Sequence, residues 1–216
     1  MMNIIFLGPP GSGKGTQAKL MAKKLQAQYF ESGDVLREKA KEKSALGQEI
    51  DRLLNKEGKY VPDEMMKAIV SDWLSKANLD EEMVFDGYPR TKDQYLVFQE
   101  MLVAKGVKIN KVIYLRVNEK EVIKRLSARR ICSQCDLEFN LVTKPPKKDE
   151  LCDQCQEKLI QRQDDAPEII KKRLEIYNQL TKPLVEFVRQ QGILEEVDGE
   201  RPIEVIHQDI LARLEK

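Results

Sequence analysis

A glycine-rich loop near the N-terminus has the residue types and spacing of a phosphate-binding site. Residues 8–16 read GPPGSGKGT and match the G-x-x-x-x-G-K part of a P-loop, between an apolar run and a helical pattern. Glycines leave backbone N–H groups free to surround phosphate oxygens, and the helix N-terminus and Lys14 add positive charge. Gly15 stands where Ser or Thr usually follows the lysine. The alternative is a glycine turn that only opens a helix.

The four cysteines form two Cys-x2-Cys pairs, and 16 residues separate the pairs. They are Cys132, Cys135, Cys152 and Cys155. Each pair aims two thiolates at one point, and four thiolates suit a tetrahedral Zn²⁺ with no open coordination position. The spacing therefore predicts a structural zinc ion that holds a small β unit together. The alternatives are four free thiols, a redox pair, or an independent zinc ribbon that binds nucleic acid.

The elements that must position these groups alternate between strand and helix. We expect strands at 3–7, 83–85, 111–117 and 193–197, with a weaker one at 29–30, and helices at 14–27, from Glu119 and from about Pro202. This alternation is typical of right-handed βαβ units, a parallel sheet and helices on both faces. Ligands then belong at the carboxyl ends of the strands.

Two stretches interrupt this alternation. Residues 32–61 contain two polar helical patterns, at 34–43 and 46–56, without a strong strand. Residues 128–165 contain all four cysteines and little helical periodicity. Both are predicted to be insertions on the ligand side of one core.

The composition excludes some classes of protein. Of 216 residues, 34% are charged, yet the net charge is only +1, which argues against a nucleic-acid or membrane-surface binder. No apolar run approaches the roughly 18 residues that span a bilayer, and the N-terminus has no basic region of a signal peptide. A cytoplasmic protein with reduced or metal-bound cysteines is predicted.

Four further strings follow the glycine loop in order: SGDVLR at 32–37, DGYPRT at 86–91, ARR at 128–130 and KRL at 172–174. Together these motifs resemble adenylate kinases over essentially the whole chain, in particular the long-lid form with a zinc-binding lid. The resemblance implies an α/β P-loop nucleoside-monophosphate kinase fold, with a five-stranded parallel sheet flanked by helices and two mobile inserts. The core would comprise 1–31, 62–127 and 166–216, the NMP-binding insert 32–61, and the lid 128–165.

The resemblance also implies two nucleotide sites. ATP would be bound by Gly11, Ser12, Gly13, Lys14, Gly15, Thr16, Arg125, Arg129, Phe139 and Arg201. AMP would be bound by Ser32, Arg37, Lys59, Tyr60, Val61, Gly87, Tyr88, Pro89, Arg90, Gln94, Arg162 and Arg173. Gln94 corresponds to the glutamine that reads adenine, because an amide pairs with a donor and an acceptor together.

This chain departs from the family pattern at several of these places. Ser32 replaces a usual Thr, Tyr88 a frequent Phe, and Phe139 a usual Tyr that packs on the ATP base. Glu138 and Asn140 replace the commoner Ser or Thr and His. The lid contacts to ATP are therefore the part of the resemblance that the residues support least.

Phosphoryl transfer depends on positioning and on cations where negative charge accumulates. The candidate catalytic residues are Lys14, Arg90, Arg125, Arg129, Arg162 and Arg173, and Arg37 is a further cation. Arg125 and Arg129 are four residues apart and are predicted to share one helix face. Asp86 ends an apolar strand and is predicted to hold Mg²⁺ through water, or else to form only an Asp-Gly turn. Asp164 and Asp165 are predicted to orient arginines or the lid hinge.

The function implied is reversible transfer, MgATP + AMP = 2 ADP, in a direct in-line step by a monomeric enzyme that maintains adenine nucleotide balance and energy homeostasis. The phosphate of AMP is already anionic, so no general base is needed. One alternative is a kinase of other base or donor specificity, such as a UMP/CMP kinase or a GTP-using relative. Another is a P-loop NTPase or switch with a nucleic-acid-binding zinc ribbon.

Overall fold

Five short strands form one parallel sheet in the order β2-β3-β1-β4-β8. They are β1 (Asn3–Leu7), β2 (Gln28–Glu31), β3 (Met83–Asp86), β4 (Lys111–Arg116) and β8 (Leu194–Asp198). The structure, a computed structural model, describes residues 1–214. All five predicted strands are confirmed, and the α/β class with a five-stranded parallel sheet is correct.

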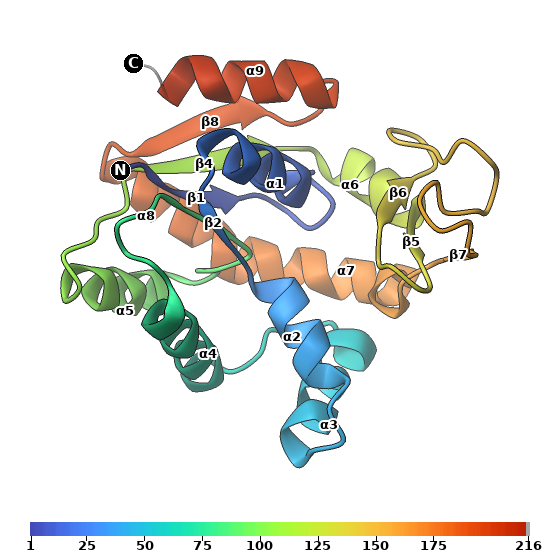
Figure 1. The fold of residues 1–216 in the computed structure, drawn as a ribbon, viewed down its shortest axis with the longest axis horizontal. Helices are drawn as coiled ribbons and strands as arrows, with labels where there is room; N and C mark the ends of the chain where they lie inside the picture. The colour runs from blue at the N-terminus through green and yellow to red at the C-terminus, as the bar shows by residue number, and fades with distance from the viewer. Residues whose placement is uncertain (215–216) are drawn as a thin grey trace.

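The helices that flank the sheet are α1 (Lys14–Leu25), α4 (Asp63–Lys76), α5 (Lys92–Val103), α6 (Glu119–Ser127), α7 (Pro167–Ile176), α8 (Lys182–Gln190) and α9 (Ile203–Leu214). A short π-helical segment, η3 (Tyr177–Thr181), joins α7 to α8. Figure 1 shows α9 and α1 on one side of the sheet and α4, α5 and α8 on the other.

Alternation of side chains along the strands explains this layering. Ile5 of β1 faces a core shared with α4, α5 and α8, whereas Ile4 and Phe6 face a second core shared with α1 and α9. Successive strand residues point to opposite faces, so a strand that is apolar throughout needs helices on both sides. Every residue of β1 is buried.

The strand order places the glycine loop at a switch point of the sheet. β1 pairs with β3 on one side and β4 on the other. The loop after β1 therefore opens at the carboxyl edge, where parallel sheets bind ligands. Gly13, with a φ of 88°, ends the loop and begins α1 in a conformation that favours glycine.

The stretch 32–61 forms three short helical segments instead of joining the sheet. They are α2 (Ser32–Ala40), α3 (Ala45–Asp51) and the π-helical η1 (Arg52–Glu57). Ser44 caps α3 by accepting a hydrogen bond from the N–H of Gly47 at 3.0 Å. Leu36 and Ile50 are buried in the same core as Ile5, between the sheet and α4, α5 and α8, and they anchor this insert.

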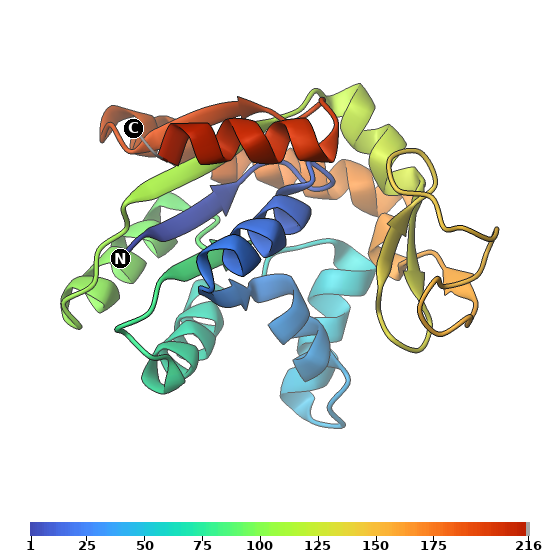
Figure 2. The same ribbon diagram turned by 45° about the horizontal axis from the view of Figure 1, so that its top comes forward.

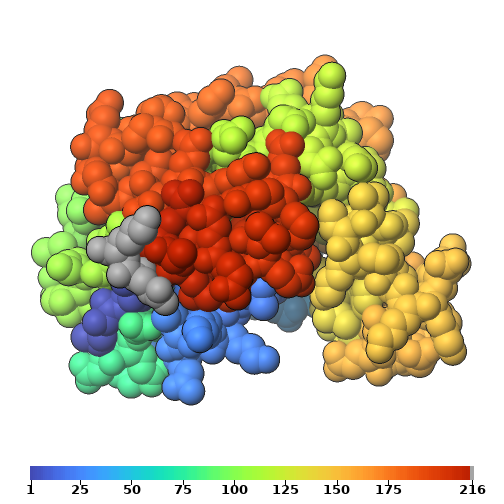
Figure 3. Space-filling view, turned by 90° about the horizontal axis from the view of Figure 1, so that it is seen from above, coloured from blue at the N-terminus to red at the C-terminus, as the bar shows by residue number. Residues whose placement is uncertain are grey.

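The stretch 128–165 contains a small antiparallel sheet, the lid sheet, in the order β6-β5-β7. Its strands are β5 (Arg129–Cys132), β6 (Glu138–Asn140) and β7 (Leu159–Ile160), and η2 (Gln163–Asp165) leads back to α7. Figure 2 shows the lid sheet at the side toward which β1 points, and in Figure 3 it forms a lobe beside the core. Lys41 after α2 lies 3.5 Å from Asp136 of this lobe.

The prediction that Arg125 and Arg129 lie on one face of a helix is wrong. Helix α6 ends at Ser127, and Arg129 begins β5, so Arg125 and Arg129 do not share a helix face. The chain turns at Ala128, and the two guanidinium groups have different partners. No helix among residues 1–214 is both long enough and apolar enough to cross a membrane.

Candidate active site

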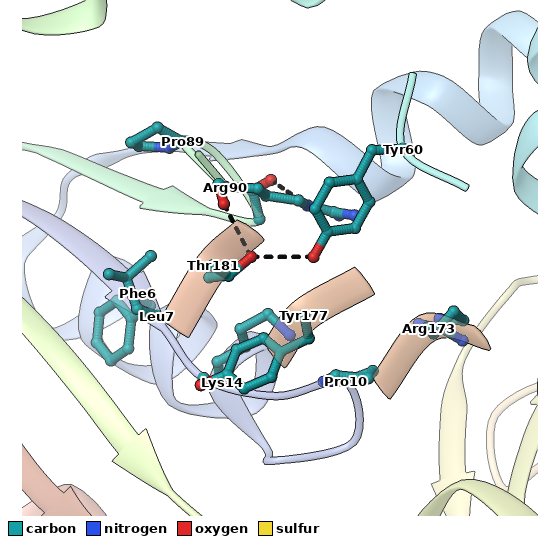
Figure 4. A pocket seen from close by; sticks show the side chains of 12 residues that line it. Phe6, Leu7, Pro10, Lys14, Tyr60, Pro89, Arg90, Arg173, Tyr177 and Thr181 are labelled. Carbon is teal, nitrogen blue, oxygen red and sulfur yellow. Dashed lines mark hydrogen bonds between the residues drawn. The ribbon is translucent and has the colours of Figure 1, made fainter. Parts of the chain in front are cut away.

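Lys14 lies in a pocket at the carboxyl edge of the sheet. Its lining includes Gly8 and Pro10 of the loop, Arg90, and Arg173 of α7 (Figure 4). The Lys14 ammonium lies 3.4 Å from the carbonyl of Pro9. Burial lowers the pKa of Lys14 to about 8; Asp86 opposes this shift, and Arg90 and Arg173 add to it. The pocket lining therefore concentrates positive charge and contains no carboxylate of its own.

Asp86 immediately precedes Gly87 of this pocket lining and is 4% exposed. Its Oδ1 has no hydrogen-bond partner in the structure, and a Cβ placed on Gly15 would lie 3.1 Å from its Oδ2. Glycine after Lys14 thus leaves room for this carboxylate. Burial raises the pKa of Asp86, and Lys14 opposes the rise. A buried carboxylate oxygen without a partner suits a cation or its water.

A second carboxylate, Glu31, stands beside Asp86 in the sheet, since the two residues pair across β2 and β3. Glu31 accepts a hydrogen bond from Tyr29 at 2.9 Å and pairs with Arg37 at 3.2 Å and Lys19 at 3.0 Å. Burial raises the pKa of Glu31, with Asp86 adding to the shift. Arg37 is also held by Asp34.

Three of the predicted arginines converge on two buried aspartates. Arg129 donates two hydrogen bonds to Asp165, at 2.7 and 2.6 Å. Arg162 donates two to Asp164, both at 2.9 Å, and Arg173 pairs with Asp164 at 3.0 Å. This set of five residues is called the arginine–aspartate cluster. It confirms that Asp164 and Asp165 orient arginines.

Three guanidinium groups in the cluster have only two buried carboxylate partners, Asp164 and Asp165; the third partner, Glu138, is half-exposed and lies 3.1 Å from Arg162. Burial opposes ionisation of Asp164, but Arg173 and Arg162 hold its pKa well below the usual range. Burial lowers the pKa of Arg173 to about 10, with Asp164 opposing and Arg129 adding to the shift. Arg173 also lines the pocket that contains Lys14, so the cluster borders that pocket.

Arg125 lies at the other side of the glycine loop. Its guanidinium donates to the carbonyls of Gly199 at 2.8 Å and Ser12 at 3.4 Å, and it pairs with Glu121 at 2.8 Å. Arg201 follows Gly199 by two residues and pairs with Asp209. Arg125 thus joins the glycine loop to the loop after β8, in which Arg201 lies, apart from the arginine–aspartate cluster.

Arg90 is fixed from several directions. It donates to the Gly87 carbonyl at 2.7 Å and to Ser32 Oγ at 3.3 Å, and its guanidinium lies 4.7 Å from the centre of the Tyr60 ring. The Thr181 hydroxyl donates to the Arg90 carbonyl at 2.8 Å and shares a 3.0 Å hydrogen bond with Tyr60 (Figure 4). Arg90 is therefore pre-organised at the edge of the pocket.

A second cavity continues behind Arg90. Its lining is Ser32, Leu36, Leu54, Tyr60, Val61, Met66, Gly87, Tyr88, Arg90 and Gln94. The walls are mostly apolar or aromatic, and Gln94 supplies the amide. Seven of the residues predicted to bind AMP thus lie around one cavity: Ser32, Tyr60, Val61, Gly87, Tyr88, Arg90 and Gln94. Pro89 lines the pocket of Lys14 instead.

Two predicted residues are placed less favourably. The Lys59 side chain is 61% exposed and pairs with Glu57 at 2.8 Å. Phe139 is 3% exposed and packs in the lid with Cys132, Cys152 and Leu159. Lid residues cover its ring in this structure, so packing on a nucleotide base would require the ring to be uncovered.

The four cysteine sulfurs gather at one point of the lid. All lie within 4.8 Å of one another, with Cys132 3.3 Å from Cys155 and Cys135 3.6 Å from Cys152. The N–H groups of Gln134 and Cys135 each point at Cys132 Sγ from 3.4 Å. Four sulfurs at the usual Zn–S distance would lie about 3.8 Å apart, so the arrangement fits a tetrahedral metal.

Three further residues belong to this region, although no sequence motif indicated them: Asp63, Tyr177 and Thr181. Thr181 and Tyr177 line the pocket from the segment between α7 and α8, and Asp63 contacts Gln94. None stands in a recognisable motif, so only their position in the fold reveals them.

Comparison with known proteins adds the family context. A family model described as "Adenylate kinase" matches residues 6–193. A protein named "Adenylate kinase" from Archaeoglobus fulgidus is 42% identical over 215 residues, covering 100% of this chain and 99% of that protein. A protein of the same name from Thermosipho africanus is 40% identical, over 97% of this chain and 98% of that protein. Another from Finegoldia magna is also 40% identical, over the full length of both chains.

Proposed function

Because the chain belongs to the adenylate kinase family and catalyses reversible transfer from MgATP to AMP, we propose that the cations around the Lys14 pocket carry out this transfer. The observation that supports this proposal most is the set of cations in one pocket: Lys14, Arg90 and Arg173 line it, and its lining contains no carboxylate. The phosphates of two nucleotides are the anions that this arrangement lacks.

The phosphates of ATP bind the glycine loop in this proposal. Backbone N–H groups of residues 11–16 and the N-terminus of α1 face the β- and γ-phosphates, and Lys14 supplies a charge that follows the transferred group. Arg125 is held at the loop by Ser12 and Gly199, so it closes the ATP side. Arg201 stands next to it. Phe139, although covered by lid residues in this structure, stays a candidate for packing on the ATP base.

The arginine–aspartate cluster supplies the remaining cations. Arg129, Arg162 and Arg173 sit on the chain that enters and leaves the lid, so closing the lid brings them onto the phosphates. Asp164 and Asp165 hold them until then. The transferred group passes directly from ATP to AMP, because the AMP phosphate is a ready nucleophile. The pocket lining contains no histidine, cysteine or carboxylate, and its hydroxyl groups, on Tyr60, Tyr177 and Thr181, are already hydrogen-bonded.

The second cavity binds the AMP base and Arg37 and Arg90 bind its phosphate. Apolar walls cover the base, and Gln94 offers it a donor and an acceptor. Lys59 contributes only its backbone in this proposal, since its side chain is exposed. Asp86 is the residue that would hold water around the Mg²⁺ of the substrate, through its unpartnered Oδ1.

The inserts 32–61 and 128–165 are proposed to be mobile and to close over both nucleotides. Closure expels water that could otherwise accept the phosphoryl group. We also propose a monomeric enzyme in the cytoplasm, where the four free cysteines would stay reduced or metal-bound. The absence of a nucleic-acid partner is a further proposal, which rests on the net charge of +1.

One coupled assay tests the function. ADP formation from MgATP is measured with AMP, UMP, CMP or no acceptor. We expect fast ADP formation with AMP only and slow ATP hydrolysis without an acceptor, because the site is completed by the second nucleotide. An ATPase rate unaffected by AMP would identify a switch or an NTPase instead, and equal rates with UMP or CMP would identify a different base specificity.

Zinc is proposed for the lid because the donor set fits it. The ion would be bound by Cys132, Cys135, Cys152 and Cys155. These four ligands leave no open coordination position for a substrate, so the metal would only hold the lid sheet together. The cluster of Cys132, Phe139, Cys152 and Leu159 is a very small core for this lobe. A lobe of this size usually needs such a cross-link.

We expect the purified chain to contain about one zinc ion per molecule by elemental analysis. Cys135→Ser should lose the metal and lower activity, because the lid sheet loses its cross-link and the arginines next to it lose their positions. Ser133→Ala, in the same turn, is the matched control and should retain both. A fully active chain with no stoichiometric metal would contradict the proposal.

A further inference from the structure

Both ends of the Gln94 side-chain amide are already bound in the structure. Its Oε1 accepts a hydrogen bond from the backbone N–H of Arg90 at 2.7 Å, and its Nε2 donates one to Asp63 Oδ1 at 2.6 Å. Gln94 is 4% exposed and is fixed further by its own N–H, which donates to Thr91 Oγ1 at 3.1 Å.

These two partners determine which way the amide points. A backbone N–H can only donate and a carboxylate can only accept, so Oε1 must face Arg90 and Nε2 must face Asp63. Turning the amide over would place N–H against N–H and oxygen against oxygen. Such a turn leaves buried polar groups without partners, which is costly where water has little access.

Each end of the amide still has one unused bond. Oε1 has a second lone pair and Nε2 a second hydrogen. Gln94 lines the second cavity, whereas Asp63, at the start of α4, is not among the residues that line it. Asp63 therefore acts on a ligand only through Gln94.

We propose that Asp63 determines base specificity by locking the Gln94 amide in the orientation that accepts a 6-aminopurine and rejects a 6-oxopurine. An adenine edge offers an amino donor beside a ring-nitrogen acceptor, and it matches Oε1 and Nε2 in that order. The hypoxanthine of IMP offers an oxygen acceptor beside an N–H donor, which is the reverse order. IMP would need the inverted amide that Asp63 and Arg90 exclude. This inference rests on the proposed binding of the AMP base in the second cavity.

Substitution of Asp63 by asparagine tests the lock. An asparagine side chain can present either an oxygen or an NH₂ group, so only the N–H of Arg90 still favours one orientation of the Gln94 amide. The AMP-to-IMP ratio of kcat/KM should fall by about tenfold or more, since a bidentate pair discriminates by about that factor. The loss should lie in KM for AMP and in a gain for IMP, rather than in kcat. The ratio is measured on one preparation, so partial unfolding does not affect it.

Two variants control for other effects. Asp63→Glu keeps an acceptor and should restore most of the ratio. Glu64→Gln removes a neighbouring charge from the same first turn of α4 and should leave the ratio unchanged. An unchanged ratio in Asp63→Asn overturns the lock.

Gln94→Leu separates this inference from the proposed function. If Gln94→Leu changes the ratio and Asp63→Asn does not, Gln94 still reads the base and only the lock is wrong. If neither variant changes the ratio, the assignment of the base to the second cavity fails as well.

Discussion

Replacing Lys14 by methionine is expected to lower kcat for ADP formation by about 10³-fold or more. Methionine has a similar length and no charge, so the change removes the cation and preserves much of the shape. Removing one donor from a preorganised anion site typically costs on the order of 10²–10³ in rate. Lys14 should lie at the upper end because it sits in the shared pocket with Arg90 and Arg173. A steady-state assay of ADP formation measures the loss.

The pKa of about 8 gives this variant a second readout. Below pH 8, the Lys14 amine of the free enzyme is protonated and attracts phosphate. Above pH 8 the amine is neutral, so it must take up a proton when ATP binds. The affinity for ATP should therefore fall by up to about tenfold per pH unit above 8 in the wild type, and this dependence should be absent in Lys14→Met. Lys23→Met, on the exposed side of α1, is the control. Near-normal turnover in Lys14→Met would contradict the assignment of the loop.

The sequence was sufficient for features that depend on local spacing. The glycine loop, the paired cysteines and the five strands all follow from short patterns, because a P-loop, a Cys-x2-Cys turn and a buried strand are each defined within a few residues. The two interruptions of the strand–helix alternation coincide with the insert helices and the lid sheet. Their boundaries as mobile domains stay a prediction.

The sequence was insufficient where a contact joins distant residues. Arg125 and Arg129 differ in partner because the chain leaves α6 between them, and helix ends are poorly specified by pattern. Thr181 reaches Arg90 across 91 positions, and Asp63 reaches Gln94 across 31. No spacing rule describes such pairs. Burial of Phe139 in the lid core likewise depends on the fold of the whole lobe.

The charge of the chain is balanced overall, whereas the lining of the Lys14 pocket contains three cations and no carboxylate. Charged residues make up 34% of the chain with a net of +1. Many exposed pairs, such as Lys76 with Asp72, balance locally. At the arginine–aspartate cluster, three guanidinium groups share the buried Asp164 and Asp165, and only the half-exposed Glu138 adds a third carboxylate. The two aspartates keep the arginines together, next to the place where we propose that the ligand's phosphates bind. The aspartates should therefore matter most when no nucleotide is bound.

Replacing Asp164 by asparagine is expected to destabilise the free enzyme by about 3 kcal/mol, because it leaves Asp165 as the only buried carboxylate, with the half-exposed Glu138, for three largely buried guanidinium groups. For a chain of this size that lowers Tm by about 6–12 °C. Asp72→Asn, which breaks an exposed ion pair, is the control and should change stability by less than about 0.5 kcal/mol. Thermal unfolding with and without nucleotide measures both variants.

The stability deficit of Asp164→Asn should shrink when a saturating mixture of MgATP, AMP and ADP is present. Phosphates then neutralise the arginines that the missing carboxylate leaves unpaired, so the ligand stabilises the variant more than the wild type. The deficit should also shrink in acid. The pKa of Asp164 is below its ordinary 3.8 in the folded protein, so its contribution is complete above that value and is lost as the pH falls through it and then through the folded pKa. A deficit that is equal with and without nucleotide would show that Asp164 supports only the fold, and that its arginines do not turn to the phosphates.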